Sequence, residues 1–318
     1  MSTESRKIPI GISSCLLGQQ VRYDGGHKND SYINGTLGEF FEFLPYCPEL
    51  GAGLGVPRPP IRLVGDEQSP RALGVKDASL DVTEALKDYS RRTVAELPPI
   101  RGYLLKRASP SCGMERVKVY TDKGMPNGSS SGLFAAELMR AHPLLPVEEE
   151  GRLGDAVLRE NFIQRVFVYD RWLRLVEAGM SPGGLVDFHT HHKLIVLAHD
   201  EPGYRELGRI VANAGSGDIT EISSEYITKL MSSLKKKATR NRHSNVLMHL
   251  MGYLKKHLDG DDKAELLESI DAYRGGEVPL VVPLVLLKHH FRRHPDPYVQ
   301  GQYYLDPHPS ELRLRNTL

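Results

Sequence analysis

The spacing of hydrophobic residues predicts alternating strands and helices in the first half of the chain. Short apolar runs typical of buried strands alternate with segments in which apolar residues recur every three or four positions, as on one face of a helix. The predicted strands are residues 7–14, 100–105 and 144–147, and the predicted helices are residues 33–43, 81–96 and 131–141. This alternation is typical of a parallel sheet with flanking helices, a Rossmann-like α/β fold.

The second half has a different pattern, in which strand signals nearly vanish. Helical spacing is predicted for residues 155–178, 187–198, 204–214, 226–234, 245–257 and 263–273. Charged residues and two glycines interrupt the pattern at 150–154. A chain of 318 residues is also too long for one ordinary core. We therefore expect an α/β domain at residues 1–152 and a mostly α-helical domain at residues 153–318.

Composition narrows the class of protein only slightly. Hydrophobic residues make up 40% and charged residues 25% of the chain, which is ordinary for a globular protein. The net charge of +1 gives no indication of a nucleic-acid partner. The N-terminus has no apolar run typical of a signal peptide, and no stretch reaches the roughly 20 apolar residues of a membrane helix. We expect a soluble, cytoplasmic protein.

The three cysteines are the main candidates for chemistry. An odd number of cysteines in a chain of this length is not a disulfide framework, and the lack of a C-x-x-C pair argues against a zinc ribbon or thioredoxin-type site. Cys15, Cys47 and Cys112 each follow a strand-like segment or its immediate exit. Ligands bind at the carboxyl ends of the strands in an open parallel sheet, so the three thiols could converge there. The spacing alone also allows three unrelated buried thiols.

The sequence blocks around the cysteines are distinctive. They read SSCLLG followed by VRYDGGHK, then YCPELGAGLGVPRPP, then KRASPSCG. In this order they resemble the thiouracil desulfurase family, over about the first 150 residues. The second half resembles an uncharacterised helical domain often fused to that family, through HHKLIVLAHD, SNVLMHLMGYLKKHL, YRGGEVPL and QYYLDPHP. The fused architecture is similar to that of tRNA 4-thiouridine desulfidases.

The resemblance implies a 4Fe–4S cluster held by Cys15, Cys47 and Cys112. A cluster normally has four cysteine ligands, so three would leave one iron open. An open position distinguishes a catalytic metal from a structural one, and a soft thiocarbonyl sulfur suits iron. The implied reaction is hydrolytic: sulfide is released, uridine remains, and the cluster acts as a Lewis acid.

The resemblance also carries over two residues as functional positions. Glu49, two residues after Cys47, would exchange protons with water and the intermediate. Ser109, three residues before Cys112, would relay a proton or bind the substrate. Their ordinary structural roles would be a solvated loop acid and a turn-forming serine. The weaker candidates for substrate binding are Tyr23, Asp24, Arg58 and Ser111, of which Arg58 would hold a phosphate or a base edge.

The second half contains a basic segment. Residues 226–258 include eight Lys or Arg residues and no Asp or Glu. They are Lys229, Lys235, Lys236, Lys237, Arg240, Arg242, Lys255 and Lys256, with His243, His249 and His257 between them. Such a run indicates binding to a phosphate backbone, although a solvated helix face is the common alternative.

The leading hypothesis is a desulfidase that acts on 4-thiouridine in tRNA. One alternative is the same chemistry on free thiouracil or thionucleosides. Another is a non-catalytic RNA-binding or redox-sensing protein with oxidation-sensitive thiols. We expect neither a membrane nor DNA as a partner.

Overall fold

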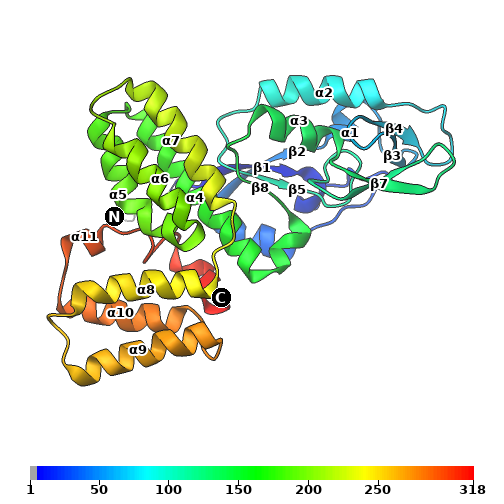
Figure 1. Cartoon of the computed structure of the whole chain (residues 1–318). Helices are drawn as coiled ribbons and strands as arrows, with labels where there is room; N and C mark the ends of the chain where they lie inside the picture. The colour runs from blue at the N-terminus through cyan, green and yellow to red at the C-terminus, as the bar shows by residue number, and fades with distance from the viewer. Residues whose placement is uncertain (1–5) are drawn as a thin grey trace. The chain divides into compact units, whose positions relative to one another are not determined.

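The computed structural model describes residues 6–318. It divides into two compact units, Met1–Gly154 and Asp155–Leu318, which are described separately below (Figure 1). The first unit contains every strand of the described chain, and the second consists of helices joined by short turns.

The first unit contains two four-stranded sheets. The strands are β1 (Ile8–Ser13), β2 (Phe41–Tyr46), β3 (Ile61–Gly65), β4 (Pro70–Gly74), β5 (Tyr103–Leu105), β6 (Val117–Tyr120), β7 (Pro126–Ser130) and β8 (Val147–Glu149). One sheet has the order β2-β1-β5-β8, and all its pairs are parallel. The other has the order β4-β3-β6-β7, with β3 and β6 parallel and the outer pairs antiparallel.

The helices of the first unit are few. They are α1 (Pro48–Gly51), α2 (Thr83–Ala95) and α3 (Leu133–Ala141). The helices α2 and α3 pack side by side (Figure 1). The predicted α/β class, a parallel sheet with helices, is confirmed.

The strand order places a ligand crevice at the end of β1. From β1 the chain goes first to β2 on one side and later to β5 on the other. Ligands bind where the direction of strand order reverses in this way, outside the carboxyl ends of the strands. The strand β1 has the apolar sequence IPIGIS and is almost entirely buried, as expected for a central parallel strand.

The predictions for the first unit were wrong in part and incomplete. The predicted helix at 33–43 consists of short helical turns up to Glu39, and Phe41–Tyr46 is strand β2. Pairing with β1, from Ile8 opposite Phe41 onward, outweighs the local helical spacing. The second sheet was not predicted, because its strands are four or five residues long and β7 is largely exposed.

The second unit is helical, as predicted. Its helices are α4 (Ala156–Glu177), α5 (Pro182–His199), α6 (Glu201–Ala212), α7 (Ile219–Leu234), α8 (Arg240–Leu254), α9 (Gly260–Gly275), α10 (Val281–Arg293) and α11 (Pro297–Gln300). The helix α10 was not predicted. Pro283 lies in the first turn, where the missing N–H has no helical partner to lose, and Leu287 and Phe291 bury the apolar face. No helix of residues 6–318 is long and apolar enough to span a membrane.

Candidate functional site

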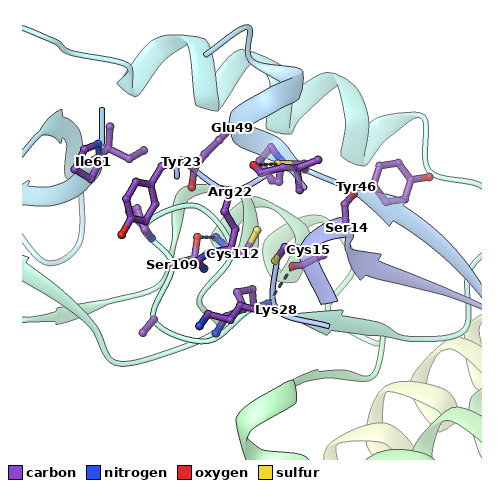
Figure 2. Close-up of a pocket in the computed structure, with 18 of the residues that line it drawn as sticks. Ser14, Cys15, Arg22, Tyr23, Lys28, Tyr46, Glu49, Ile61, Ser109 and Cys112 are labelled. Carbon is purple, nitrogen blue, oxygen red and sulfur yellow. Dashed lines mark hydrogen bonds between the residues drawn. The ribbon is translucent and has the colours of Figure 1, made fainter. Parts of the chain in front are cut away.

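Cys15, Cys47 and Cys112 line the same cavity at the carboxyl ends of β1, β2 and β5. The cavity has a volume of about 380 Å³. Cys15 lies in the 3₁₀ turn after β1, Cys47 follows β2 directly and precedes α1, and Cys112 lies in the loop after β5. Figure 2 shows Cys15 and Cys112 around this cavity with Ser109, Glu49 and Tyr23. The three adjacent strands therefore bring together thiols that are distant in sequence.

All three cysteines are free thiols in a largely desolvated site. Burial raises the pKa of Cys15 to about 11, although the charge of Lys106 opposes this. Burial also raises the pKa of Cys47, and it raises that of Cys112 well above the ordinary value despite a hydrogen bond from Ser13. The thiols are thus protonated at neutral pH on their own, and a bound metal centre would have to displace the protons.

The donors at the cavity are of the type that an iron–sulfur cluster takes. No group of His, Cys, Asp or Glu among residues 6–318 is arranged to hold one metal ion. An iron–sulfur cluster takes each cysteine on a different iron, so its thiolates stand farther apart than those around one ion. Three free thiols line this one cavity, and the chain has no fourth cysteine, so the number and type of donors suit a cluster with three protein ligands.

Glu49 is held by two other residues that the sequence had suggested. The Arg58 guanidinium donates to Glu49 Oε2 through Nε at 2.8 Å and lies 2.7 Å from it through Nη2. Ser111 Oγ donates to Glu49 Oε1 at 3.0 Å. Arg58 also donates to the carbonyl oxygens of Gly55 and Val21. Arg58 is therefore buried, lines the cavity and orients the Glu49 carboxylate, and its role on a phosphate or base edge stays a prediction.

Ser109 organises the loop that carries Cys112. Its Oγ accepts hydrogen bonds from the backbone N–H groups of Ser111, at 3.2 Å, and Cys112, at 3.1 Å. Ser109 also lines the cavity, so its own hydroxyl hydrogen remains available there. Ser109 can therefore stabilise the turn and still contact a substrate in the cavity, the two roles considered from the sequence.

Of the remaining candidates, only Tyr23 lines the cavity. Its side chain is 41% exposed, and the guanidinium of Arg22 lies 5.5 Å from its ring centroid. Asp24 does not line the cavity and instead accepts the backbone N–H of Gly26 at 3.0 Å, which lowers its pKa. Asp24 is therefore a turn residue.

Sequence reasoning missed several residues of the cavity, of which Ser13 and Lys106 are the two that the neighbouring strands position. Ser13 ends β1, and its Oγ accepts the backbone N–H of Lys106 at 3.0 Å. Lys106 follows β5 directly and lines the cavity. Both lie inside the quoted cysteine blocks, but their role depends on the pairing of β1 with β5, which sequence spacing does not specify.

Gly132 supports the Cys112 loop by leaving room for it. A Cβ atom there would lie 2.5 Å from the backbone carbon of Ser111 and 2.8 Å from the backbone nitrogen of Cys112. We predict that Gly132→Ala displaces this loop, lowers the melting temperature and reduces bound iron, since such overpacking costs about 1–3 kcal/mol. Gly35→Ala is the control, because a Cβ there has no neighbour within 4 Å. Equal melting temperatures and iron contents in the two variants would contradict this role.

The basic segment of the second unit is less uniform than its sequence suggested. Lys236 pairs with Asp200 at 2.7 Å, and Lys229 pairs with Glu206. Arg242 donates to the carbonyl oxygen of His199 at 2.6 Å, and Arg240 donates to that of Tyr273 at 3.3 Å. The partners of these four residues all lie outside residues 226–258.

The remaining cations lie at the two ends of α8. Lys235 and Lys237 precede the helix, and Lys255 and Lys256 follow it. A helix of 15 residues is about 22 Å long, so the segment forms two separate basic clusters. All four of these lysines are exposed.

Comparisons with known proteins follow the same two units. Residues 10–150 match the family model for 2-thiouracil desulfurase, and residues 193–309 match that for a protein of unknown function, DUF1722. The chain is 36% identical over 154 residues to uncharacterized protein YbgA of Escherichia coli (strain K12), which covers 48% of this chain and 91% of that protein.

Two further similarities were found. Uncharacterized protein YbbK of Bacillus subtilis (strain 168) is 33% identical over 138 residues, covering 42% of this chain and 90% of that protein. A solved structure of the 4Fe-4S-dependent thiouracil desulfidase TudS is 34% identical, covers 47% of this chain and 95% of that chain, and has a TM-score of 0.36. The matched segment 10–150 contains all three cysteines and Glu49, and the chain belongs to the 2-thiouracil desulfurase family.

Proposed function

We propose that the protein is an iron–sulfur-dependent desulfidase that hydrolytically removes sulfur from 4-thiouridine in tRNA. The observation that carries this proposal is the convergence of three free cysteines and one oriented carboxylate on a single cavity. The reaction converts the ring C=S group and water into C=O and hydrogen sulfide, so it consumes no electrons.

Cys15, Cys47 and Cys112 would hold a 4Fe–4S cluster with one iron open. When bound, the cluster supplies a Lewis acid that polarises the thiocarbonyl group through its soft sulfur. The buried surroundings of Cys15 and Cys112 keep bulk water from the ligands. The family of the chain and the thiol environment both support this cofactor.

Glu49 is the proton carrier in this proposal. Its carboxylate takes a proton from the attacking water and returns one to the departing sulfur. Arg58 and Ser111 each fix one of its oxygen atoms, which keeps the carboxylate at one position throughout. Oε2 receives both Arg58 contacts, whereas Oε1 retains a second lone pair for the water.

Ser109 and Tyr23 would contact the pyrimidine. The hydroxyl hydrogen of Ser109 is available to donate to the ring oxygen or nitrogen, since the Ser109 oxygen accepts from the backbone. The ring of Tyr23 at the cavity is a stacking surface for a base, a contact typically worth about 1–3 kcal/mol in nucleic-acid binding.

The helical unit would supply affinity for tRNA through the lysines at the ends of α8. Lys237, Lys255 and Lys256 are exposed and have no ion pair within residues 6–318. Phosphate contacts give affinity without sequence information. The alternative, desulfidation of free thiouracil or thionucleosides, needs only the first unit, and the cavity alone does not exclude it.

We predict that the triple variant Lys237→Gln, Lys255→Gln, Lys256→Gln loses activity on tRNA mainly through a higher KM. Its binding should have a salt slope smaller by about three, roughly one for each lost phosphate contact. Free 4-thiouridine is the internal control, because a nucleoside carries no phosphate for these lysines to bind. An equal loss on both substrates would assign the lysines to the fold instead.

The proposed function is tested by sulfide release from three substrates. The anaerobically loaded protein is incubated with tRNA containing 4-thiouridine, with free 4-thiouridine and with 2-thiouracil, and sulfide and uridine or uracil are quantified. We expect the highest kcat/KM on the tRNA. Faster turnover of a free base would favour the alternative, and no sulfide from any of them would reject the desulfidase.

A further inference from the structure

Lys106 is a cation anchored at the cysteine cavity by an ion pair. Its Nζ lies 2.5 Å from Glu150 Oε1 and donates to the carbonyl oxygen of Arg107 at 3.1 Å. The second oxygen, Glu150 Oε2, accepts the backbone N–H of Arg107 at 2.7 Å. The side chains of Lys106 and Glu150 are only 15% and 12% exposed.

The topology of the sheet creates this pair. The strands β5 and β8 are parallel neighbours, and their last residues, Leu105 and Glu149, lie opposite each other. The next residue of each strand, Lys106 and Glu150, therefore lies at the same end of the sheet. The backbone N–H of Lys106 also donates to Ser13 Oγ at the end of β1. A lysine side chain is normally flexible, but here three adjacent strands fix its backbone and its ammonium group.

The charged residues that line the cavity are mostly cations, which favours the binding of an anion. Its charged lining residues are five cations, Arg22, Lys28, Arg58, Lys106 and Arg107, and one acid, Glu49. Arg58 is committed to Glu49. Lys28 and Arg107 are exposed, and Arg22 lies 3.6 Å from Asp24. Lys106 is the cation that is both half-buried and rigidly held.

Lys106 lines the cavity and keeps one hydrogen-bond donor for an anion there. The ammonium has three N–H donors, of which Glu150 and the Arg107 carbonyl oxygen use two.

We propose that Lys106 is an anion-binding residue of the cavity, positioned by Glu150, and that the anion it binds is the hydrosulfide that leaves the substrate. This inference rests on the proposed function, which makes sulfide the product. It assigns Lys106 a direct contact with the departing sulfur and Glu150 an indirect, positioning role.

The test measures hydrosulfide affinity, a property separate from turnover. The anaerobically loaded full-length protein is titrated with sodium hydrosulfide, and the change in its visible absorption gives a Kd. We expect Lys106→Met to weaken this binding about tenfold or more, as for a lost hydrogen bond to a charged group. Lys106→Arg should recover most of it, and Glu150→Gln should fall between the wild type and Lys106→Met.

Lys87→Met is the matched control. Lys87 lies on α2 in an exposed pair with Glu84 and makes no contact with the cavity, so its variant has the same change in net charge. It should bind hydrosulfide like the wild type. Equal weakening in Lys87→Met and Lys106→Met, or unchanged affinity in Lys106→Met, would overturn the inference. Loss of iron in Lys106→Met, with no recovery in Lys106→Arg, would overturn it in favour of a structural role.

The inference and the proposed function fail in different ways. A wild type that binds hydrosulfide through Lys106 but releases no sulfide from any thiolated pyrimidine would reject the function and keep the anion site. A wild type that turns over substrate, with a Lys106→Met variant of unchanged hydrosulfide affinity, would keep the function and reject the anion site.

Discussion

Replacing any one of Cys15, Cys47 or Cys112 with alanine is expected to remove most of the bound iron and to abolish desulfidation. The three thiols line one cavity and the chain has no other cysteine, so no spare ligand exists. In the proposed cluster, loss of one cysteine would leave a second iron without a protein ligand. The measurements are iron per chain, visible absorption and sulfide release for each variant.

As a control, the secondary structure of each cysteine variant is compared with that of the wild type. Far-ultraviolet circular dichroism of the metal-free variants should match that of the metal-free wild type, since an alanine is tolerated at a site that lines a cavity. A single variant that kept full iron and full turnover would show that the corresponding cysteine is an ordinary buried thiol.

Glu49→Gln is expected to keep the iron but to lower kcat by about 10²–10⁴-fold, the usual contribution of a general acid–base group. The amide has nearly the same shape; its oxygen can accept from Arg58 while its NH₂ group donates to Ser111 Oγ, but it cannot take up a proton. The measurements are single-turnover rates and visible absorption. Loss of colour together with activity would indicate a role in holding the cluster.

Ser111→Ala separates the orientation of Glu49 from its chemistry. It removes one hydrogen bond to Glu49 Oε1 and leaves the Arg58 pair in place. The expected loss in kcat is about tenfold, the size of one hydrogen bond to a charged group. A loss as large as that of Glu49→Gln would mean that Ser111 itself handles a proton.

The sequence predicted the fold where periodic patterns are long. The helices at 83–95 and 133–141 and most of those after residue 155 follow from helical spacing, and β1 follows from its apolar run. Strand β2 did not, because its residues suit a helix locally and become a strand only through pairing with β1. The sheet of β3, β4, β6 and β7 was not predicted because its strands are only four or five residues long and β7 is largely exposed.

The candidate site was predictable to the extent that it lies in distinctive blocks. Cys15, Cys47, Cys112, Glu49 and Ser109 all line one cavity. Sequence could not show that Arg58 orients Glu49, because nine residues separate them and their contact depends on the turn after α1. The pair of Lys106 and Glu150 was also hidden, since it arises from the register of β5 and β8.

Thiol protection in the loaded protein tests the three-cysteine cluster most directly. The anaerobically reconstituted protein is analysed for iron and acid-labile sulfide, alkylated under native conditions, and examined by mass spectrometry beside the metal-free protein. The prediction is about four irons and four sulfides per chain, with Cys15, Cys47 and Cys112 all protected only in the loaded form. Fewer irons at full loading, or alkylation of any one of the three cysteines in the loaded form, would contradict the assignment.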